Sequence, residues 1–222
     1  MKRPSYEELL RLIREMADLS GLDLSGYKLE NFNLSLLNCR GTNFASANLY
    51  GVNFIGADLT GANFERARVA VVNFLGAKVC KANFYQADLG NACLKGADFS
   101  EADLRETDLA ATDLSLACFR GANLSGSRIE AVDGQMACFE KANLEGANLR
   151  GSSFQLADFR QANLKGANMI QVDLTGASME EADLSEADLI EAFLRGANFT
   201  GANLEGTRFR GALFEGTIGL KR

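Results

Sequence analysis

The sequence predicts an all-β solenoid, a quadrilateral parallel β-helix of about ten coils with a short N-terminal capping α-helix. The first observation is a five-residue repeat that runs from about Leu22 to Thr217 with hardly a break. The second is that phenylalanines recur at intervals of twenty residues, and the third is an N-terminal stretch with helical spacing instead. We therefore expect a capping helix in 1–21, a β-helix in 22–218 and a tail in 219–222.

Each repeat unit reads Ala-(Asp/Asn)-(Leu/Phe)-x-x, as in 57–61 and 202–206. An α-helix turns about 100° per residue, so apolar residues five apart would be scattered around it. In an extended chain, the central Leu/Phe and the Ala two residues before it share one face, and the Asp/Asn between them points away. The last two residues, often polar or Gly, suit a corner. Four such edges close one coil.

The central residues should fill a rod about 45–50 Å long if the coils stack at the usual strand spacing of about 4.8 Å. Each buried centre then contributes roughly 1.5–3 kcal/mol. Gly134 lacks a central side chain, and we interpret it as a local flattening or bulge, with a ligand site as the alternative. Phenylalanines one coil apart should stack, and the expected core stacks comprise Phe44, Phe64, Phe84, Phe99, Phe119 and Phe139.

Residues from about Tyr6 to Asp18 interrupt the repeat. Ser5 with Glu8 fits a capping box, and Gly21 is a natural stop for a helix. Because the first coil of a solenoid exposes its core and unpaired backbone groups, we expect this helix to cover it; recruitment of a partner is the alternative. The covering face, spaced as in an amphipathic helix, comprises Leu9, Leu12, Ile13 and Met16.

Composition argues against an enzyme. The 222 residues contain no histidine and no tryptophan, and no motif indicates a cofactor. Nearly every Asp occupies the outward position before a centre, so neighbouring aspartates should point out on different faces and cannot share a substrate. The four that look like a cluster in the sequence are Asp98, Asp103, Asp108 and Asp113.

The net charge of −6 also disfavours direct binding of nucleic acid, because an acidic chain repels phosphates. No apolar run has the length of a membrane span, and the N-terminus does not have the form of a secretory signal. We therefore expect a cytoplasmic protein that binds neither nucleic acid nor membrane.

Five cysteines occupy repeat positions instead of forming a spaced framework. Cys39 replaces a central Leu and should be buried. Cys118 and Cys138 lie one coil apart at an outward position, which is within disulfide range, but two reduced thiols are the preferred interpretation. We expect no zinc site, because no third or fourth ligand clusters with them in the sequence.

Outward positions become apolar near the C-terminal end, where no covering helix is expected. Phe193 and Leu213 take the Asp/Asn position one coil apart on one face, and Ile170 and Ile190 stack on the preceding face. This pattern predicts a homodimer through the C-terminal end. The alternative is that these residues fold over the last coil as a lid.

A second apolar ladder consists of Leu116, Met136 and Leu156, which lie twenty residues apart at the corner position usually given to Gly. Packing of the corners within the monomer explains it. A groove for a partner is the alternative.

The repeated Gly-Ala-Asn-Leu and Ala-Asp-Leu motifs resemble the pentapeptide-repeat family over nearly the whole chain after the first turns. This resemblance implies a right-handed quadrilateral β-helix, and the regular repeat resembles that of many such proteins of photosynthetic bacteria. Solenoids offer extended surfaces and little chemistry, so the expected function is a rigid, non-catalytic module that docks an unidentified protein partner.

The resemblance also implies an alternative function. Some pentapeptide-repeat proteins mimic duplex DNA, bind DNA gyrase and protect it from quinolones. The charge pattern ranks this function second, since arginines interrupt the face that carries Asp88 and Asp108, at Arg68, Arg128 and Arg208.

Overall fold

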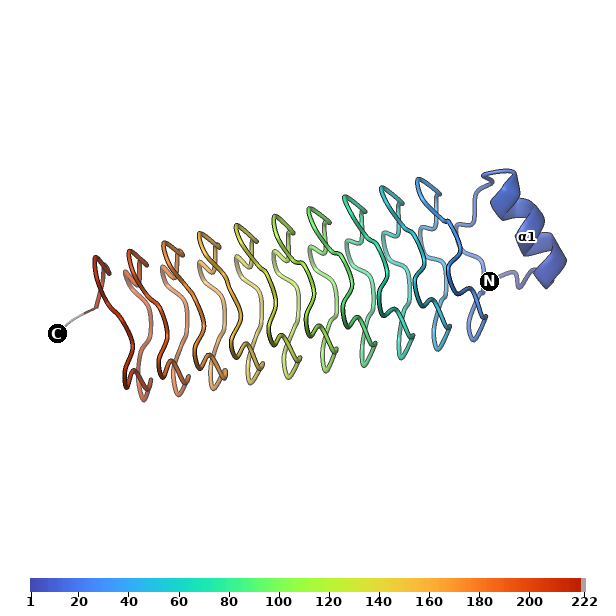
Figure 1. The fold of residues 1–222 in the computed structure, drawn as a ribbon. Coiled ribbons are helices and arrows are strands. Elements are labelled where there is room, and N and C mark those ends of the chain that lie inside the picture. Colours follow the sequence, from blue (N-terminus) through green and yellow to red (C-terminus); the bar gives the residue numbers. More distant parts are fainter. Residues whose placement is uncertain (221–222) are drawn as a thin grey trace.

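The computed structural model describes residues 1–220 as a rod of stacked coils with one helix at the N-terminal end (Figure 1). Helix α1 spans Tyr6–Arg14. Beyond it, isolated parallel bridges join each outward Asp/Asn position to the same position twenty residues later, ending at Asn198–Ile218. A corner follows each edge too soon for longer strands to form, so pairing is limited to these bridges. The expected parallel register of one coil per twenty residues is confirmed.

Hydrogen bonds between coils repeat with the same period. The Phe44 N–H donates to the Asn63 carbonyl at 2.6 Å, and the Asn63 N–H donates to the Thr42 carbonyl at 3.0 Å. Within the corner, the Ala47 N–H donates to the Phe44 carbonyl at 2.9 Å. Backbone polar groups along the rod are thus satisfied by neighbouring coils, as burial around an apolar core requires.

One residue in each corner lies in the left-handed region of backbone space. Glycine fits this conformation at the lowest cost, as at Gly61 with φ 68°. Charged residues also occupy it, including Arg66 with φ 53° and Glu101 with φ 59°. The corner therefore accepts a side chain at a cost of about 1–2 kcal/mol, which matters for the ladder described below.

The phenylalanine rings stack along the inside of the rod. Ring centroids one coil apart lie 4.5 to 5.4 Å from each other, which is close to the spacing of the coils. Aromatic contacts of this kind add about 0.5–1.5 kcal/mol to the burial of each pair. The six rings named from the sequence are fully buried: Phe44, Phe64, Phe84, Phe99, Phe119 and Phe139.

The expected bulge at Gly134 is wrong. The Gly134 N–H donates to the Ser153 carbonyl at 2.7 Å, and the bridge between Asp133 and Ser153 keeps its register. A Cβ at Gly134 would lie 2.3 Å from Cδ1 of Phe154. The ring of the next coil therefore fills the space of the missing side chain, which leaves neither a bulge nor a ligand cavity at this position.

Helix α1 covers the N-terminal coil with part of the predicted face. Leu9 is fully buried, and Leu12 and Ile13 pack against the core. Met16 was expected to join them, but it lies beyond the end of α1 and is 56% exposed. Met16 adopts φ 52°, so the chain leaves the helix there. Gly21 does not end the helix; with φ 64° it forms a corner of the first coil.

The capping box is only half formed. Ser5 caps the helix by accepting the Glu8 N–H at 3.1 Å. The Glu8 carboxylate does not return to Ser5 and instead pairs with the Lys2 ammonium at 2.6 Å. Lys2 itself forms a parallel bridge with Leu22, so the chain before α1 belongs to the first coil.

The β-helix begins earlier than the predicted start at 22. Leu19 is already a buried centre, and its N–H donates to the Asn38 carbonyl at 2.9 Å. Of the predicted tail, Leu220 packs against the core, and 221–222 lie outside the described residues. None of the helices found in 1–220 has the length and apolar character of a membrane span.

Candidate interaction surfaces

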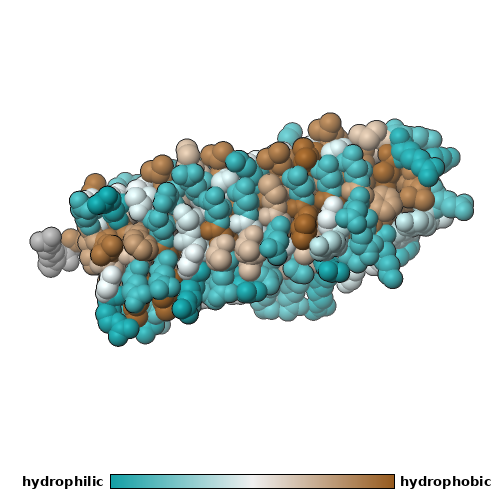
Figure 2. Space-filling view, viewed as in Figure 1, coloured by the Kyte–Doolittle hydropathy of each residue, from teal (hydrophilic) through white to brown (hydrophobic). Residues whose placement is uncertain are grey.

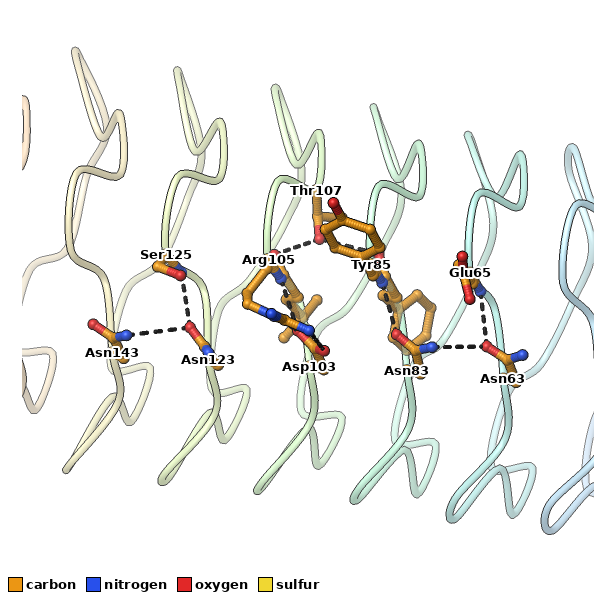
Figure 3. Close-up of polar contacts among 12 residues, drawn as sticks. Asn63, Glu65, Asn83, Tyr85, Asp103, Arg105, Thr107, Asn123, Ser125 and Asn143 are labelled. Atoms are coloured by element: carbon orange, nitrogen blue, oxygen red, sulfur yellow. Dashed lines mark hydrogen bonds and ion pairs between the residues drawn. The ribbon is translucent and has the colours of Figure 1, made fainter.

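The outward Asp and Asn side chains hold the corners in place. Asn83 Oδ1 accepts the Tyr85 N–H at 3.0 Å, and Asn83 Nδ2 donates to Asn63 Oδ1 at 3.0 Å (Figure 3). Asp103 Oδ1 likewise accepts the Arg105 N–H at 3.2 Å. Because Asp and Asn share this Oδ1 acceptor, either residue can close the turn. The repeated use of Asp or Asn at this position in the sequence is the signal for this hydrogen-bonding role.

The four aspartates near the centre of the chain do not converge. Asp98, Asp103, Asp108 and Asp113 belong to four separate series of bridges and so to four different faces. Hydrogen bonds from the Arg105 guanidinium lower the pKa of Asp103. It therefore serves as an ionised structural group and not as one half of an acid–base pair.

One cluster of metal-ligating types does form, contrary to the expectation that no third ligand gathers around the cysteines. The Sγ of Cys138 and carboxylate oxygens of Glu140 and Asp158 lie within 4.8 Å of one another. Two arginines already neutralise the carboxylates, with Arg120 2.9 Å from Glu140 and Arg160 2.6 Å from Asp158. We therefore describe the cluster as a surface ion-pair network and assign no metal to it.

The five cysteines are free thiols. Cys118 and Cys138 face each other across a parallel bridge, and burial raises the pKa of Cys138. Cys39 is a buried centre, as predicted, and burial raises its pKa to about 12. A thiol with so high a pKa is protonated at neutral pH and a poor nucleophile.

The apolar residues near the C-terminal end differ in exposure. Phe193 and Leu213 are joined by a bridge and are 47% and 57% exposed. Ile170 and Ile190 are only half-buried neighbours on the preceding face. Phe193 and Leu213 point outward, so they do not form a lid. We call this pair the end patch.

The corner ladder is also exposed. Leu116, Met136 and Leu156 are 54%, 54% and 59% exposed, and Leu36 at the equivalent corner is 73% exposed. Hydrophobic residues recur along the upper edge of the rod in Figure 2. Packing within the monomer therefore explains only part of this ladder.

Comparison with known proteins identifies the repeat. The family model of pentapeptide repeats matches eight copies, over residues 38–70, 72–100, 87–126, 137–176 and 177–216. No curated protein sequence matches the chain.

The solved structure of HetL shows the same fold. HetL is a pentapeptide repeat protein involved in heterocyst differentiation regulation in the cyanobacterium Nostoc sp. strain PCC 7120; it is 27% identical over 100% of both chains, with a TM-score of 0.65. QnrB1, a plasmid-mediated fluoroquinolone resistance protein, is 21% identical over 84% of this chain and 89% of its own, with a TM-score of 0.35. Since the family model covers most of the sequence, the chain belongs to the pentapeptide-repeat family and forms the right-handed β-helix solenoid of that family.

Proposed function

We propose that the protein is a rigid, non-catalytic module that binds another protein through apolar residues at outward positions. The observation that carries this proposal is the end patch, where Phe193 and Leu213 replace the usual Asp or Asn and remain 47% and 57% exposed. Large exposed apolar side chains on an otherwise polar surface mark sites of protein association. Aromatic residues such as Phe193 are also enriched in such contacts.

The rod is well suited to present such a patch. Its coils are joined by hydrogen bonds on every edge, so the patch keeps its shape before binding and little conformational entropy is lost. The relationship to HetL supports a regulatory role, because that protein acts in the regulation of cell differentiation.

A homodimer through the C-terminal end is the arrangement we propose for the end patch. Phe214 and Ile218 lie close by in the last described coils and are 40% and 57% exposed, so the apolar surface continues past Leu213. In the described residues no helix covers this end of the rod (Figure 1).

Light scattering tests the end patch. We expect the variant Phe193→Asp with Leu213→Asp to lose the end-to-end contact, because two carboxylates from each copy would then be buried in it. Asn168→Asp, which adds charge to a neighbouring face, is the control and should change nothing. An unchanged mass of 23.9 kDa for wild type and variant alike would refute the end-to-end dimer.

A capture experiment tests a different protein partner. Immobilised wild type should retain a protein from the native host that the end-patch variant does not retain. Equal retention by both would show that the patch is not the docking surface.

The alternative function, a DNA mimic that binds gyrase, has weaker support. The face that carries Asp88 and Asp108 also carries arginines that pair with two of its aspartates. Asp108 lies 3.0 Å from Arg128, and Asp188 pairs with Arg208. A continuous negative stripe of the DNA type is thus interrupted. We expect no effect on gyrase supercoiling, with or without quinolone, at micromolar protein; inhibition or protection would restore this alternative.

A further inference from the structure

We propose that a second copy of the chain packs side by side and antiparallel against the face that carries the corner ladder. This ladder face comprises the outward residues of 31–36 and of the equivalent segments up to 171–176. The inference deepens the interaction function proposed above, because it names a partner and a surface. The end patch lies on this same face of the rod, in the coils that follow 171–176, since Asp173 is joined to Phe193 by a bridge.

The left-handed backbone conformation of the ladder residues is unfavourable in free energy, and contacts within the monomer do not offset this cost. Leu116, Met136 and Leu156 adopt φ between 57° and 61°, where a side chain costs about 1–2 kcal/mol more than in ordinary backbone and Gly fits freely. Val71, on the other corner of the same face, is a β-branched residue with φ 60° and is 45% exposed. Contacts with another molecule would explain why large apolar side chains occupy these positions.

The corner column is complementary to itself. A two-fold axis perpendicular to the rod and passing between Gly96 and Leu116 places every bulky residue of one copy opposite a glycine of the other. Along the rod the column reads Leu36, Gly56, Gly76, Gly96, Leu116, Met136, Leu156 and Gly176.

The pairs at the centre of this arrangement have room to form. Leu116 faces Gly96 and Met136 faces Gly76, and no atom lies within 4 Å of where a Cβ would stand at either glycine. At the ends of the column, Leu36 and Leu156 each lean over the glycine of the next coil of their own chain. The same rotation brings these two leucines side by side.

The polar residues of the ladder face follow the same symmetry. The rotation places Asn73 opposite Asp133 and Asn33 opposite Asp173, so no carboxylate faces another. Asn33 and Asn73 use Oδ1 to close their own turns, and within 1–220 their Nδ2 groups donate no hydrogen bond. These amide donors can therefore reach the carboxylates of the second copy.

The face is also poor in charge. Among its outward residues in 31–176, the charged side chains are Lys95, Asp113, Asp133 and Asp173. Lys95 falls opposite Ser115 of the second copy, and Asp113 lies in the same repeat unit as Ser115. The Lys95 ammonium of each copy is therefore near the Asp113 carboxylate of the other, which gives one favourable ion pair on each side of the axis. On the corner with Val71, the rotation brings Ala131 of the second copy against it.

The contact area suffices for a specific dimer of moderate affinity. From Leu36 to Gly176 the column spans seven steps of the bridge register, or about 34 Å. A strip of that length and about 15 Å wide buries about 500 Å² on each copy, so the total of about 1,000 Å² reaches the lower bound for specific interfaces.

A charge swap tests the antiparallel pairing. All proteins carry Phe193→Asp and Leu213→Asp, so that contacts through the end patch are absent. We expect this parent to sediment at twice 23.9 kDa and Met136→Lys or Gly76→Glu to weaken the dimer at least tenfold. Combining the two should restore it, because the lysine of each copy then faces the glutamate of the other copy, which gives two ion pairs related by the axis.

A matched control separates this effect from strain in the corner. Gly146→Glu changes a corner glycine with φ 64° on another edge of the rod, where no atom crowds a Cβ, and should leave the dimer intact. Circular dichroism should be the same for all variants.

Three outcomes would overturn the proposal. The first is a parent that stays monomeric up to about 100 μM, a concentration at which a dimer with a Kd in the micromolar range would form. The second is a dimer that survives both single substitutions. The third is a folded double variant that remains monomeric, as a parallel pairing would require. The capture experiment with the end patch is independent of these results, so the proposed function can stand or fail separately.

Discussion

Restoring the repeat at Gly134 should destabilise the protein. The family pattern favours Leu or Phe at this central position, so Gly134→Leu would seem to fill a defect. A Cβ there would lie 2.3 and 2.4 Å from the Phe154 ring, which occupies the space. Phe154 is fully buried and meets Phe139 and Phe159 edge-on at 5.6 and 5.4 Å, so the ring cannot move aside freely.

The magnitude follows from packing. Inserting a side chain into a filled core costs about 1–3 kcal/mol. Phe154→Leu alone should cost roughly 1–2 kcal/mol, because it leaves a cavity above Gly134. In the double variant the new leucine fills that cavity, so the free energy of unfolding should return close to the wild-type value. The two substitutions should therefore couple by about 2 kcal/mol or more.

Urea unfolding followed by circular dichroism measures this cycle, and the slope of each transition shows whether the variants unfold as the wild type does. The reasoning is refuted if Gly134→Leu alone is more stable than the wild type. It is equally refuted if the effects of the two substitutions simply add.

Three further predictions concern the core, the cap and the acid limit of stability. Phe119→Ala, in the middle of a stack, should lower the free energy of unfolding by about 3–5 kcal/mol in the same assay. Phe214→Ala, at a 40% exposed position, should lower it far less. Equal losses would contradict the difference in burial between the two rings. Leu9→Glu should expose the first coil and cost at least about 3 kcal/mol, with aggregation visible by light scattering. A variant that is as stable as the wild type and does not aggregate would show that α1 is not a cap. Hydrogen bonds from Ser25 lower the pKa of Asp23 to about 2, so the ionised carboxylate stabilises the fold above about pH 4 and this contribution is lost as the pH falls toward 2. Asp23→Asn keeps the Oδ1 acceptor without the titration, so thermal unfolding between pH 4 and about 2 should vary less with pH than in the wild type, and superimposable profiles would count against Asp23.

The repeat pattern was enough to predict the architecture because a five-residue period has few physical solutions. Helical geometry would scatter centres such as Phe44 and Phe64 around an axis, whereas edges and corners gather them on one side. The coil register followed from the same count, and so did the stacked rings and the buried Cys39. The helical spacing before Leu19 likewise predicted a capping helix, although not its end at Arg14.

The surfaces could not be predicted to the same depth. Position in the repeat indicates the face on which a residue lies, but it does not indicate which long side chains reach each other across 18 or 20 residues. Glu8 was expected to cap its own helix, yet it pairs with Lys2. Glu140 and Asp158 meet beside Cys138 because residues of successive coils lie next to each other, not because they are close in the sequence.

The amino-acid sequence thus determined the solenoid, its register and the residues of its core, because a backbone of edges and corners is the geometry that buries apolar residues spaced five apart. Contacts between coils decided the rest. Whether a missing side chain leaves a cavity depends on the ring above it, as Phe154 shows over Gly134. Whether a leucine at a corner is covered depends on the glycine beside it and on the neighbouring coil, and those distances exist only once the chain has wound into a rod.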